Sequence, residues 1–138
     1  MPSFELLCVS SLPAAELEVV REAGSIAERR DQRLTLTLLS APAPAERLRR
    51  AGLLLCLSSD PQAPATVAHA HALGVPVILV DDGGEPGAVR HGSTGIICPA
   101  APVPLADAIS WLTRRTAIRE RLRAGGLLAA GERLAQPA

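Results

Sequence analysis

The sequence contains no lysine or tyrosine, and only one phenylalanine and one tryptophan occur in its 138 residues. Proteins that hold single-stranded nucleic acid stack its bases on aromatic side chains, and this chain cannot supply such a surface. Its 14 basic residues, all arginine, are matched by 14 acidic ones, so the formal net charge is zero. Balanced charge also argues against nucleic acid and anionic membranes as partners, because phosphate binding needs a basic surplus.

Cysteine is scarce, and long apolar runs are missing. Cys8, Cys56 and Cys98 are far apart in the sequence, and each falls within a predicted strand. We therefore expect buried free thiols in a reducing compartment and no metal site. The apolar runs have the length of strands, and the chain does not open with a charged start followed by an apolar stretch. We expect a cytoplasmic protein without a signal peptide or a transmembrane segment.

The sequence does contain 48% apolar residues, in a regular alternation of strand and helix patterns. The predicted strands cover residues 4–10, 33–39, 53–57, 75–80 and 96–98. The predicted helices cover residues 13–30, 44–50, 64–73, 103–112 and 117–134. Ser11 is a candidate N-cap of the first helix, and we expect breaks or bends near Thr113 and at Gly125-Gly126.

This alternation predicts an α/β fold, a three-layer sandwich around a mostly parallel sheet of about five strands, of the Rossmann or flavodoxin-like class. The length fits a single domain over residues 1–138. In the segment 33–39, leucine alternates with threonine. We expect this strand to be half exposed at an edge of the sheet.

Residues 72–99 are the most informative stretch. The β-branched run 75–80 is typical of a parallel strand that is buried on both faces. Gly83-Gly84 follows it, and the segment 91–95 then leads into the last strand. Ligands of open α/β sheets bind beyond the carboxyl ends of the strands, where glycines let the backbone approach a ligand closely.

The same stretch resembles the donor-nucleotide half, the C-terminal domain, of retaining GT-B glycosyltransferases. The resemblance rests on Ala72-Leu73-Gly74-Val75-Pro76-Val77, on the pair Gly83-Gly84, and on Gly92-Ser93-Thr94-Gly95. Residues 105–109 and the arginine-rich segment 114–123 resemble the closing helices of that family, so the similarity extends from about residue 33 onward. It implies a nucleotide-sugar as the ligand.

The sequence departs from this family at its carboxylates. Two family glutamates fall on Pro61 and His69, and a third falls on Gly87, although Glu85 lies nearby. In the family, the second glutamate holds the ribose hydroxyls. A histidine cannot accept two hydroxyls as a carboxylate can. The resemblance therefore implies a degenerate site.

The resemblance also implies a shortened domain. Because the sequence starts at Met1, we expect the family's first strand, its lysine-bearing loop and its acceptor domain to be missing. Removing that strand from the family's sheet gives the order 2-1-3-4-5, which is flavodoxin-like.

We predict that Gly83, Gly84, Ser93 and Thr94 bind the ligand together at the carboxyl edge of the sheet. If the family alignment holds, His69 faces the same cleft. Backbone amides of the glycine pair can cradle a phosphate, although a tight turn demanded by the topology explains the pair equally. No catalytic residue, metal or cofactor is predicted.

The function that follows is a glycosyltransferase-like donor-domain protein. It is noncatalytic alone and binds a nucleotide-sugar weakly or binds a protein partner. One alternative is the donor-binding subunit of a split glycosyltransferase. Another is a receiver-like interaction module that is not phosphorylated. A phosphoryl-accepting receiver is disfavoured, because Ser10-Ser11, residues 56–59 and Pro99 stand where a receiver needs its acidic pair, its aspartate and its lysine.

We also expect a homo-oligomer or a complex with another protein. The elements that normally cover a donor half are absent, and monomers rarely expose large apolar patches. The two candidate surfaces are the edge strand 33–39 and the helix 103–112, in which Leu105, Ile109 and Leu112 share one face and Trp111 lies to its side.

Overall fold

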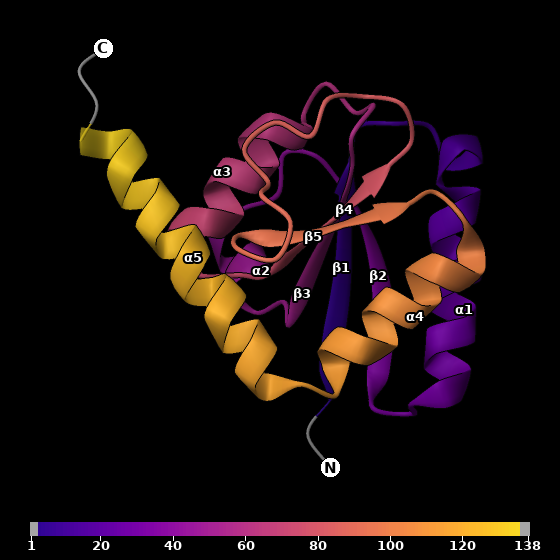
Figure 1. Ribbon diagram of the computed structural model, residues 1–138. Helices are drawn as coiled ribbons and strands as arrows, with labels where there is room; N and C mark the ends of the chain where they lie inside the picture. Colours follow the sequence, from indigo (N-terminus) through magenta and orange to yellow (C-terminus); the bar gives the residue numbers. More distant parts are fainter. Residues whose placement is uncertain (1–2, 136–138) are drawn as a thin grey trace.

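Five short runs rich in leucine, valine and isoleucine form one sheet in the computed structural model, which describes residues 3–135 (Figure 1). The strands are β1 (Phe4–Ser10), β2 (Leu34–Ser40), β3 (Leu53–Leu57), β4 (Val77–Asp81) and β5 (Gly95–Pro99). Every pairing within the sheet is parallel, in the order β2-β1-β3-β4-β5. The predicted α/β class and strand order are confirmed, and β2 lies at the sheet edge as predicted.

Helices cover both faces of the sheet. They are η1 (Ala14–Leu17), α1 (Glu18–Arg30), α2 (Ala45–Arg49), α3 (Ala63–Leu73), α4 (Pro102–Thr113) and α5 (Thr116–Ala135). Helices α1 and α4 pack together on one face, and α2 and α3 pack on the other. Helix α5 starts near the end of α4 and runs along α3 (Figure 1).

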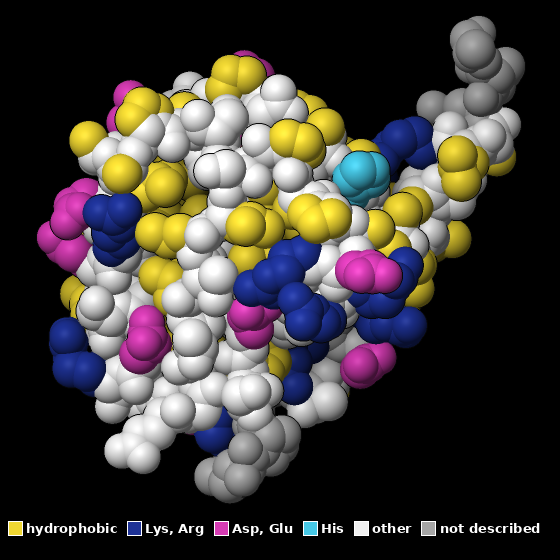
Figure 2. Space-filling view, turned by 180° about the vertical axis from the view of Figure 1, so that it is seen from behind, with side chains coloured by type: hydrophobic (Ala, Val, Ile, Leu, Met, Phe, Trp, Pro, Cys, Tyr) yellow, Lys and Arg dark blue, Asp and Glu magenta, His cyan; other side chains and the backbone are white. Residues whose placement is uncertain are grey.

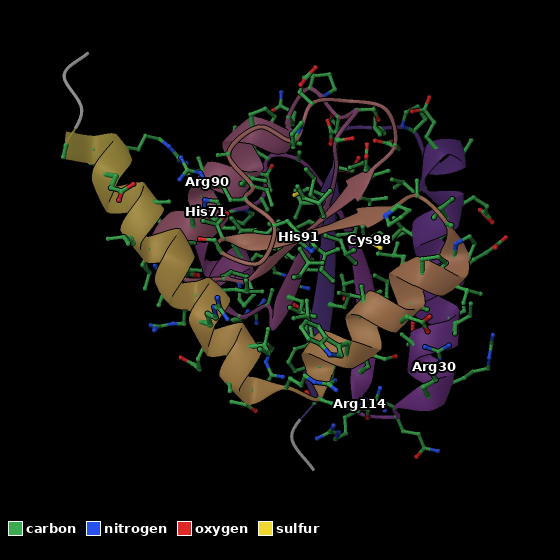
Figure 3. All side chains as sticks on the ribbon, viewed as in Figure 1. Arg30, His71, Arg90, His91, Cys98 and Arg114 are labelled. Atoms are coloured by element: carbon green, nitrogen blue, oxygen red, sulfur yellow. The ribbon has the colours of Figure 1, made fainter. Side chains whose placement is uncertain are left out.

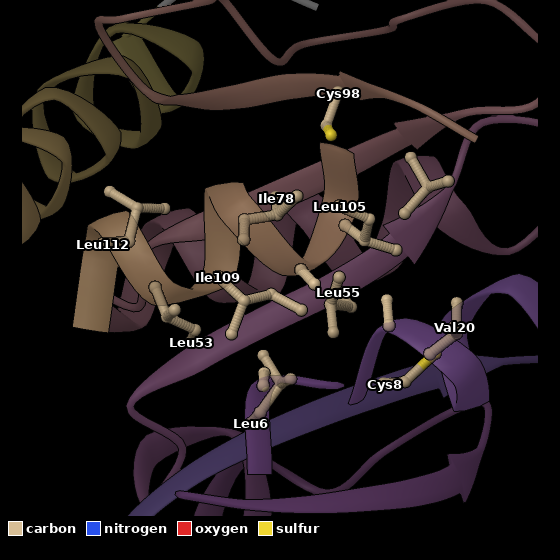
Figure 4. Close-up of a cluster of buried hydrophobic side chains, with 14 of the residues drawn as sticks. Leu6, Cys8, Val20, Leu53, Leu55, Ile78, Cys98, Leu105, Ile109 and Leu112 are labelled. Carbon is tan, nitrogen blue, oxygen red and sulfur yellow. The ribbon is translucent and has the colours of Figure 1, made fainter. Parts of the chain in front are cut away.

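The core follows the two-residue period of the strands. Leu6 and Cys8 of β1 face the layer of α1 and α4, whereas Leu7 and Val9 face the layer of α2 and α3. Figure 4 shows the first layer, where Ile109 of α4 lies among leucines of the central strands. Because both faces are covered, the central strands are apolar at nearly every position.

The surface carries mixed charge. On the face opposite to the view of Figure 1, acidic and basic side chains lie near one another, and neither sign forms an extended area (Figure 2). Among the helices of residues 3–135, none combines the length and apolar character that crossing a membrane requires.

The three cysteines are free and buried, as predicted. Burial raises the pKa of Cys8 to about 12 and also raises the pKa of Cys56 and of Cys98. These thiols are therefore protonated and unreactive at neutral pH. Within the described residues, no three histidine, cysteine or acidic side chains converge as a metal site.

Two helix predictions were wrong. Ser11 does not cap a helix, because its hydroxyl and amide bind Asp60 and the first helical turn starts after Pro13. Helix α5 runs through Gly125-Gly126 without a break, whereas the predicted break near Thr113 is present.

The glycines of α5 serve close packing. A Cβ atom on Gly125 would lie 2.0 Å from the carbonyl oxygen of Ser93, and one on Gly126 would lie 3.1 Å from Cδ2 of His71. Only glycine lets the helix approach the Ser93 loop and α3 this closely. This packing offsets the low helix propensity of glycine.

The arginine-rich start of α5 is more than a solvated surface. Arg119 donates to the carbonyl oxygens of Leu112 (2.7 Å) and Thr113 (2.6 Å) at the end of α4, and its guanidinium lies 5.0 Å from the ring centre of Phe4. Arg119 therefore satisfies carbonyls that the end of α4 leaves unpaired. Its contact with Phe4 links the α4–α5 junction to β1.

One predicted association surface is wrong. Leu105, Ile109 and Leu112 are fully buried against the sheet, so this face of α4 offers no surface on which another protein can dock. Trp111 is 37% exposed, with the guanidinium of Arg115 5.0 Å from its ring centre.

Candidate functional site

The carboxyl ends of β1, β3 and β4 carry serines and aspartates that bind one another. After β3, the nearly buried carboxylate of Asp60 accepts bonds from the amide of Ser11 (2.8 Å), the hydroxyl of Ser11 and the amide of Gln62 (2.9 Å). Burial raises the pKa of Asp60, but these hydrogen bonds outweigh it and hold the pKa below its ordinary value. Asp60 therefore joins the loops after β1 and β3 as a carboxylate.

A second carboxylate joins the loops after β3 and β4. Asp82 accepts bonds from the amide (2.8 Å) and hydroxyl (2.6 Å) of Ser59 and from the hydroxyl of Ser58 (3.0 Å). The Ser58 oxygen in turn accepts bonds from the amides of Asp82 and Gly84, both at 3.1 Å. These bonds fix the glycine loop to the end of β3.

A cavity of about 260 Å³ opens beside this network. It lies at the carboxyl edge, over the neighbouring strands β4 and β5. Its lining residues are Ser58, Leu79, Asp81, Gly84, Pro86 and Ile97. We call it the carboxyl-edge cavity. None of the arginines in residues 3–135 lines it, so its charged wall is the exposed carboxylate of Asp81.

The two predicted glycines differ in what surrounds them. Gly83 has a φ of +109°, which strains any other residue, and a Cβ there would meet no atom within 4 Å. Its amide points to Asp81 at a long 3.4 Å. A Cβ on Gly84 would lie 2.0 Å from the carbonyl oxygen of Ser58, so Gly84 is required for packing. The Gly84 amide already donates a hydrogen bond to Ser58. Of the two glycine amides, the amide of Gly83 is therefore the more available to a ligand.

Ser93 and Thr94 lie at the other edge of the sheet. Strands β4 and β5 are parallel, with Val77 beside Gly95 and Asp81 beside Pro99, so residues that precede Gly95 lie at the amino edge. The expectation that Ser93 and Thr94 lie with Gly83 and Gly84 at the carboxyl edge is therefore wrong. The sequence already indicated this separation. The turn at residues 92–95 precedes its strand, β5, whereas the pair Gly83-Gly84 follows its strand, β4.

The Thr94 turn has a structural role. The Thr94 hydroxyl accepts a bond from the amide of Arg90 (2.8 Å) and reaches the carbonyl of Ala88 (3.4 Å). Thr94 is buried, and Ser93 packs against Gly125 of α5.

The two histidines of α3 have different surroundings, one exposed to solvent and one packed in the interior. His69 is exposed, lies just past the middle of the helix and does not line the carboxyl-edge cavity. His71, which is labelled in Figure 3, is fully buried. Neither of its ring nitrogens has a hydrogen-bond partner within residues 3–135. Burial, followed by the nearby charge of Arg133, lowers the pKa of His71, although the backbone of Thr94 partly opposes this.

The positions that resemble the family's carboxylate sites lie around the start of α3. Pro61 is exposed in the turn before the helix. Glu85 and Gly87 belong to the loop that packs over Ala63 and Val67. That loop encloses only about 10 Å³ there, so these residues form no second ligand cavity.

Comparison with known proteins agrees with the fold. The family model for glycosyl transferases group 1 matches residues 27–127. The C-terminal domain of the glycosyl transferase group 1 family protein LpcC from Francisella tularensis has a TM-score of 0.79 at 13% identity, over 99% of this chain and 89% of its own. No match was found among curated protein sequences.

Two larger proteins share the fold. The pneumococcal O-GlcNAc transferase GtfA, solved with UDP and GlcNAc, has a TM-score of 0.77 at 17% identity over 94% of this chain. A GtfA/B complex gives a TM-score of 0.73 at 15% identity over 95% of this chain. The chain spans about a third of the length of each (32% and 33%). With the family model covering most of its length, the chain belongs to the glycosyl transferases group 1 family, with the fold of a GT-B C-terminal domain.

Proposed function

We propose that this chain is a donor-domain protein that binds a nucleoside diphosphate or nucleotide-sugar weakly and transfers no sugar by itself. The observation that carries the proposal is the carboxyl-edge cavity beside Gly83 and Gly84. It lies where ligands of open α/β sheets bind. The solved relative GtfA holds UDP, which makes UDP the natural probe.

We expect the nucleotide to bind weakly because of the residues that line the carboxyl-edge cavity. The Gly84 amide is occupied by Ser58, and the Asp81 carboxylate would repel a diphosphate. No arginine of the described residues lines the cavity to offset that repulsion. We expect a dissociation constant of roughly 0.1 mM or weaker, about 5 kcal/mol of binding free energy.

Absence of transfer follows from the residues near α3. Pro61, His69 and Gly87 stand where the family carries carboxylates, and exposed His69 does not reach the cavity. In GT-B enzymes transfer takes place between two domains, which together position the acceptor and exclude water. A donor domain acting alone supplies one side of such a cleft.

NMR titration with UDP tests this function. We expect shifts at Ser58, Ser59 and residues 81–86. Asp81→Asn should tighten UDP binding several-fold by removing the repelling charge, whereas the control Asp107→Asn on the exposed surface of α4 should not. Shifts confined to α5, an unchanged affinity in the Asp81 variant, or sugar transfer by the purified chain would overturn the proposal.

A second candidate is a donor-binding subunit that completes an enzyme with a separate chain. The shared fold with a member of the GtfA/B complex favours this alternative over a receiver-like module. Transfer that appears only after a second polypeptide is added would establish it.

A further inference from the structure

The amino edge of the sheet carries a second cavity, distant from the donor edge. It holds about 270 Å³ between α1, α4 and the start of β2. Ala27, Leu34 and Ile109 form its apolar floor, which is nearly closed to solvent, since none of the three is more than 4% exposed. We call it the amino-edge cavity. Its volume is near the lower limit for small-molecule sites, about 300 Å³.

Arginines surround the mouth of this cavity. Arg30, Arg33 and Arg114 line it together with a single acidic residue, Asp31. Figure 3 shows Arg30 and Arg114 at the same end of the molecule. An adjoining hollow of about 350 Å³ shares Arg33 and Arg114 and adds Arg119. Positive charge therefore exceeds negative charge around an apolar floor.

The arginines differ in how far they are already paired. Arg33 makes a bidentate pair with Asp31, with Nε at 3.0 Å and a terminal nitrogen at 2.8 Å. Arg30 binds Asp107 at 2.9 Å. Arg114 uses only its Nε, on the carbonyl oxygen of Ser110 (3.2 Å), and its terminal nitrogens bind no described residue. The guanidinium of Arg114 is thus the available anion-binding group.

We propose that the amino-edge cavity binds a small amphipathic anion, with its apolar body on Ala27, Leu34 and Ile109 and its carboxylate or phosphate on Arg114. A bare inorganic ion would gain nothing from the apolar wall, and a neutral apolar molecule would leave the guanidinium unused. A planar guanidinium binds either anionic group through two parallel hydrogen bonds. This site is independent of UDP binding at the carboxyl edge.

NMR titration of the full chain with five probes tests the ligand class. The probes are octanoate, octyl phosphate, octanol, octyltrimethylammonium and inorganic phosphate. We expect octanoate or octyl phosphate to shift Ala27, Leu34, Ile109 and Ser110, and the tighter of the two identifies the headgroup. The other three probes should bind about tenfold more weakly. Equal binding of octanol, or no shift at these residues with either anion, would overturn the proposal.

Substitution tests the role of Arg114. Arg114→Gln should weaken binding of the better anion about tenfold and leave octanol unaffected, and Arg114→Lys should restore part of the affinity. Arg121→Gln, an exposed change on α5 outside the cavity, is the matched control. Because Arg114 is exposed, both glutamine variants should melt like the parent. Equal affinity in the two variants would refute the assignment, as would displacement of the anion by UDP.

Discussion

Asp82 holds Ser59 by two hydrogen bonds, one to the amide at 2.8 Å and one to the hydroxyl at 2.6 Å. The two residues are 23 positions apart in sequence, at the ends of neighbouring strands. The pair fixes the loop that carries Gly83 and Gly84. The shape of the candidate ligand edge therefore depends on an aspartate that the sequence shows only as one of an acidic pair.

Replacing Asp82 should loosen this loop. Asp82→Ala removes bonds from Ser58 and Ser59, and we expect a loss of about 1–2 kcal/mol in the free energy of unfolding. Denaturant unfolding measures the loss. Asp81→Ala is the control, since exposed Asp81 has only the long contact to the Gly83 amide. Equal losses in the two variants would contradict the assigned role.

The close approach of α5 to the Ser93 loop can be tested with alanine. Gly125→Ala would place a Cβ 2.0 Å from a backbone oxygen that cannot move freely, and we expect a cost of about 1–3 kcal/mol. Gly131→Ala in the same helix meets no atom within 4 Å and should stabilise the protein by about 0.5–1 kcal/mol. Thermal unfolding of both variants gives the comparison, and a stabilised Gly125 variant would disprove the contact.

The buried His71 should make stability depend on pH. Because folding lowers the pKa of His71, the unfolded chain binds the proton more readily than the folded chain. The free energy of unfolding therefore has its full value above the pKa of the unfolded chain, near 6.5. Stability should then fall as pH drops from about 7 toward 5. Urea unfolding measured across this range should show a flatter profile for His71→Leu, while exposed His69→Gln should keep the parent slope. A parent profile without slope would refute this.

Association remains a prediction. Strand β2 has one unpaired edge, and Trp111 is partly exposed on α4. If copies pair through β2, sedimentation equilibrium at micromolar concentration should show dimers. If the contact includes α4, dilution should also change Trp111 fluorescence. A single-chain mass with unchanged fluorescence would leave only a complex with a different protein.

The strand order was predicted through the resemblance to GT-B donor domains. The residues alone predicted the alternation of strands and helices, the edge position of β2 and the buried state of Cys8, Cys56 and Cys98. These properties follow from local hydrophobic periodicity and from short connections, which act within one or two elements. The Gly83-Gly84 turn was also visible, because it directly follows a buried strand.

The contacts between groups far apart in the sequence became visible in the three-dimensional structure alone. It placed Ser93 and Thr94 at the edge opposite Gly83, bound Ser11 to Asp60, and packed Gly125 against the Ser93 loop. It also gathered Arg33 and the other arginines around the amino-edge cavity. Such contacts depend on register, on crossing direction and on side-chain packing between elements far apart in sequence. A local pattern contains none of that information, so the fold was predictable where the sites were not.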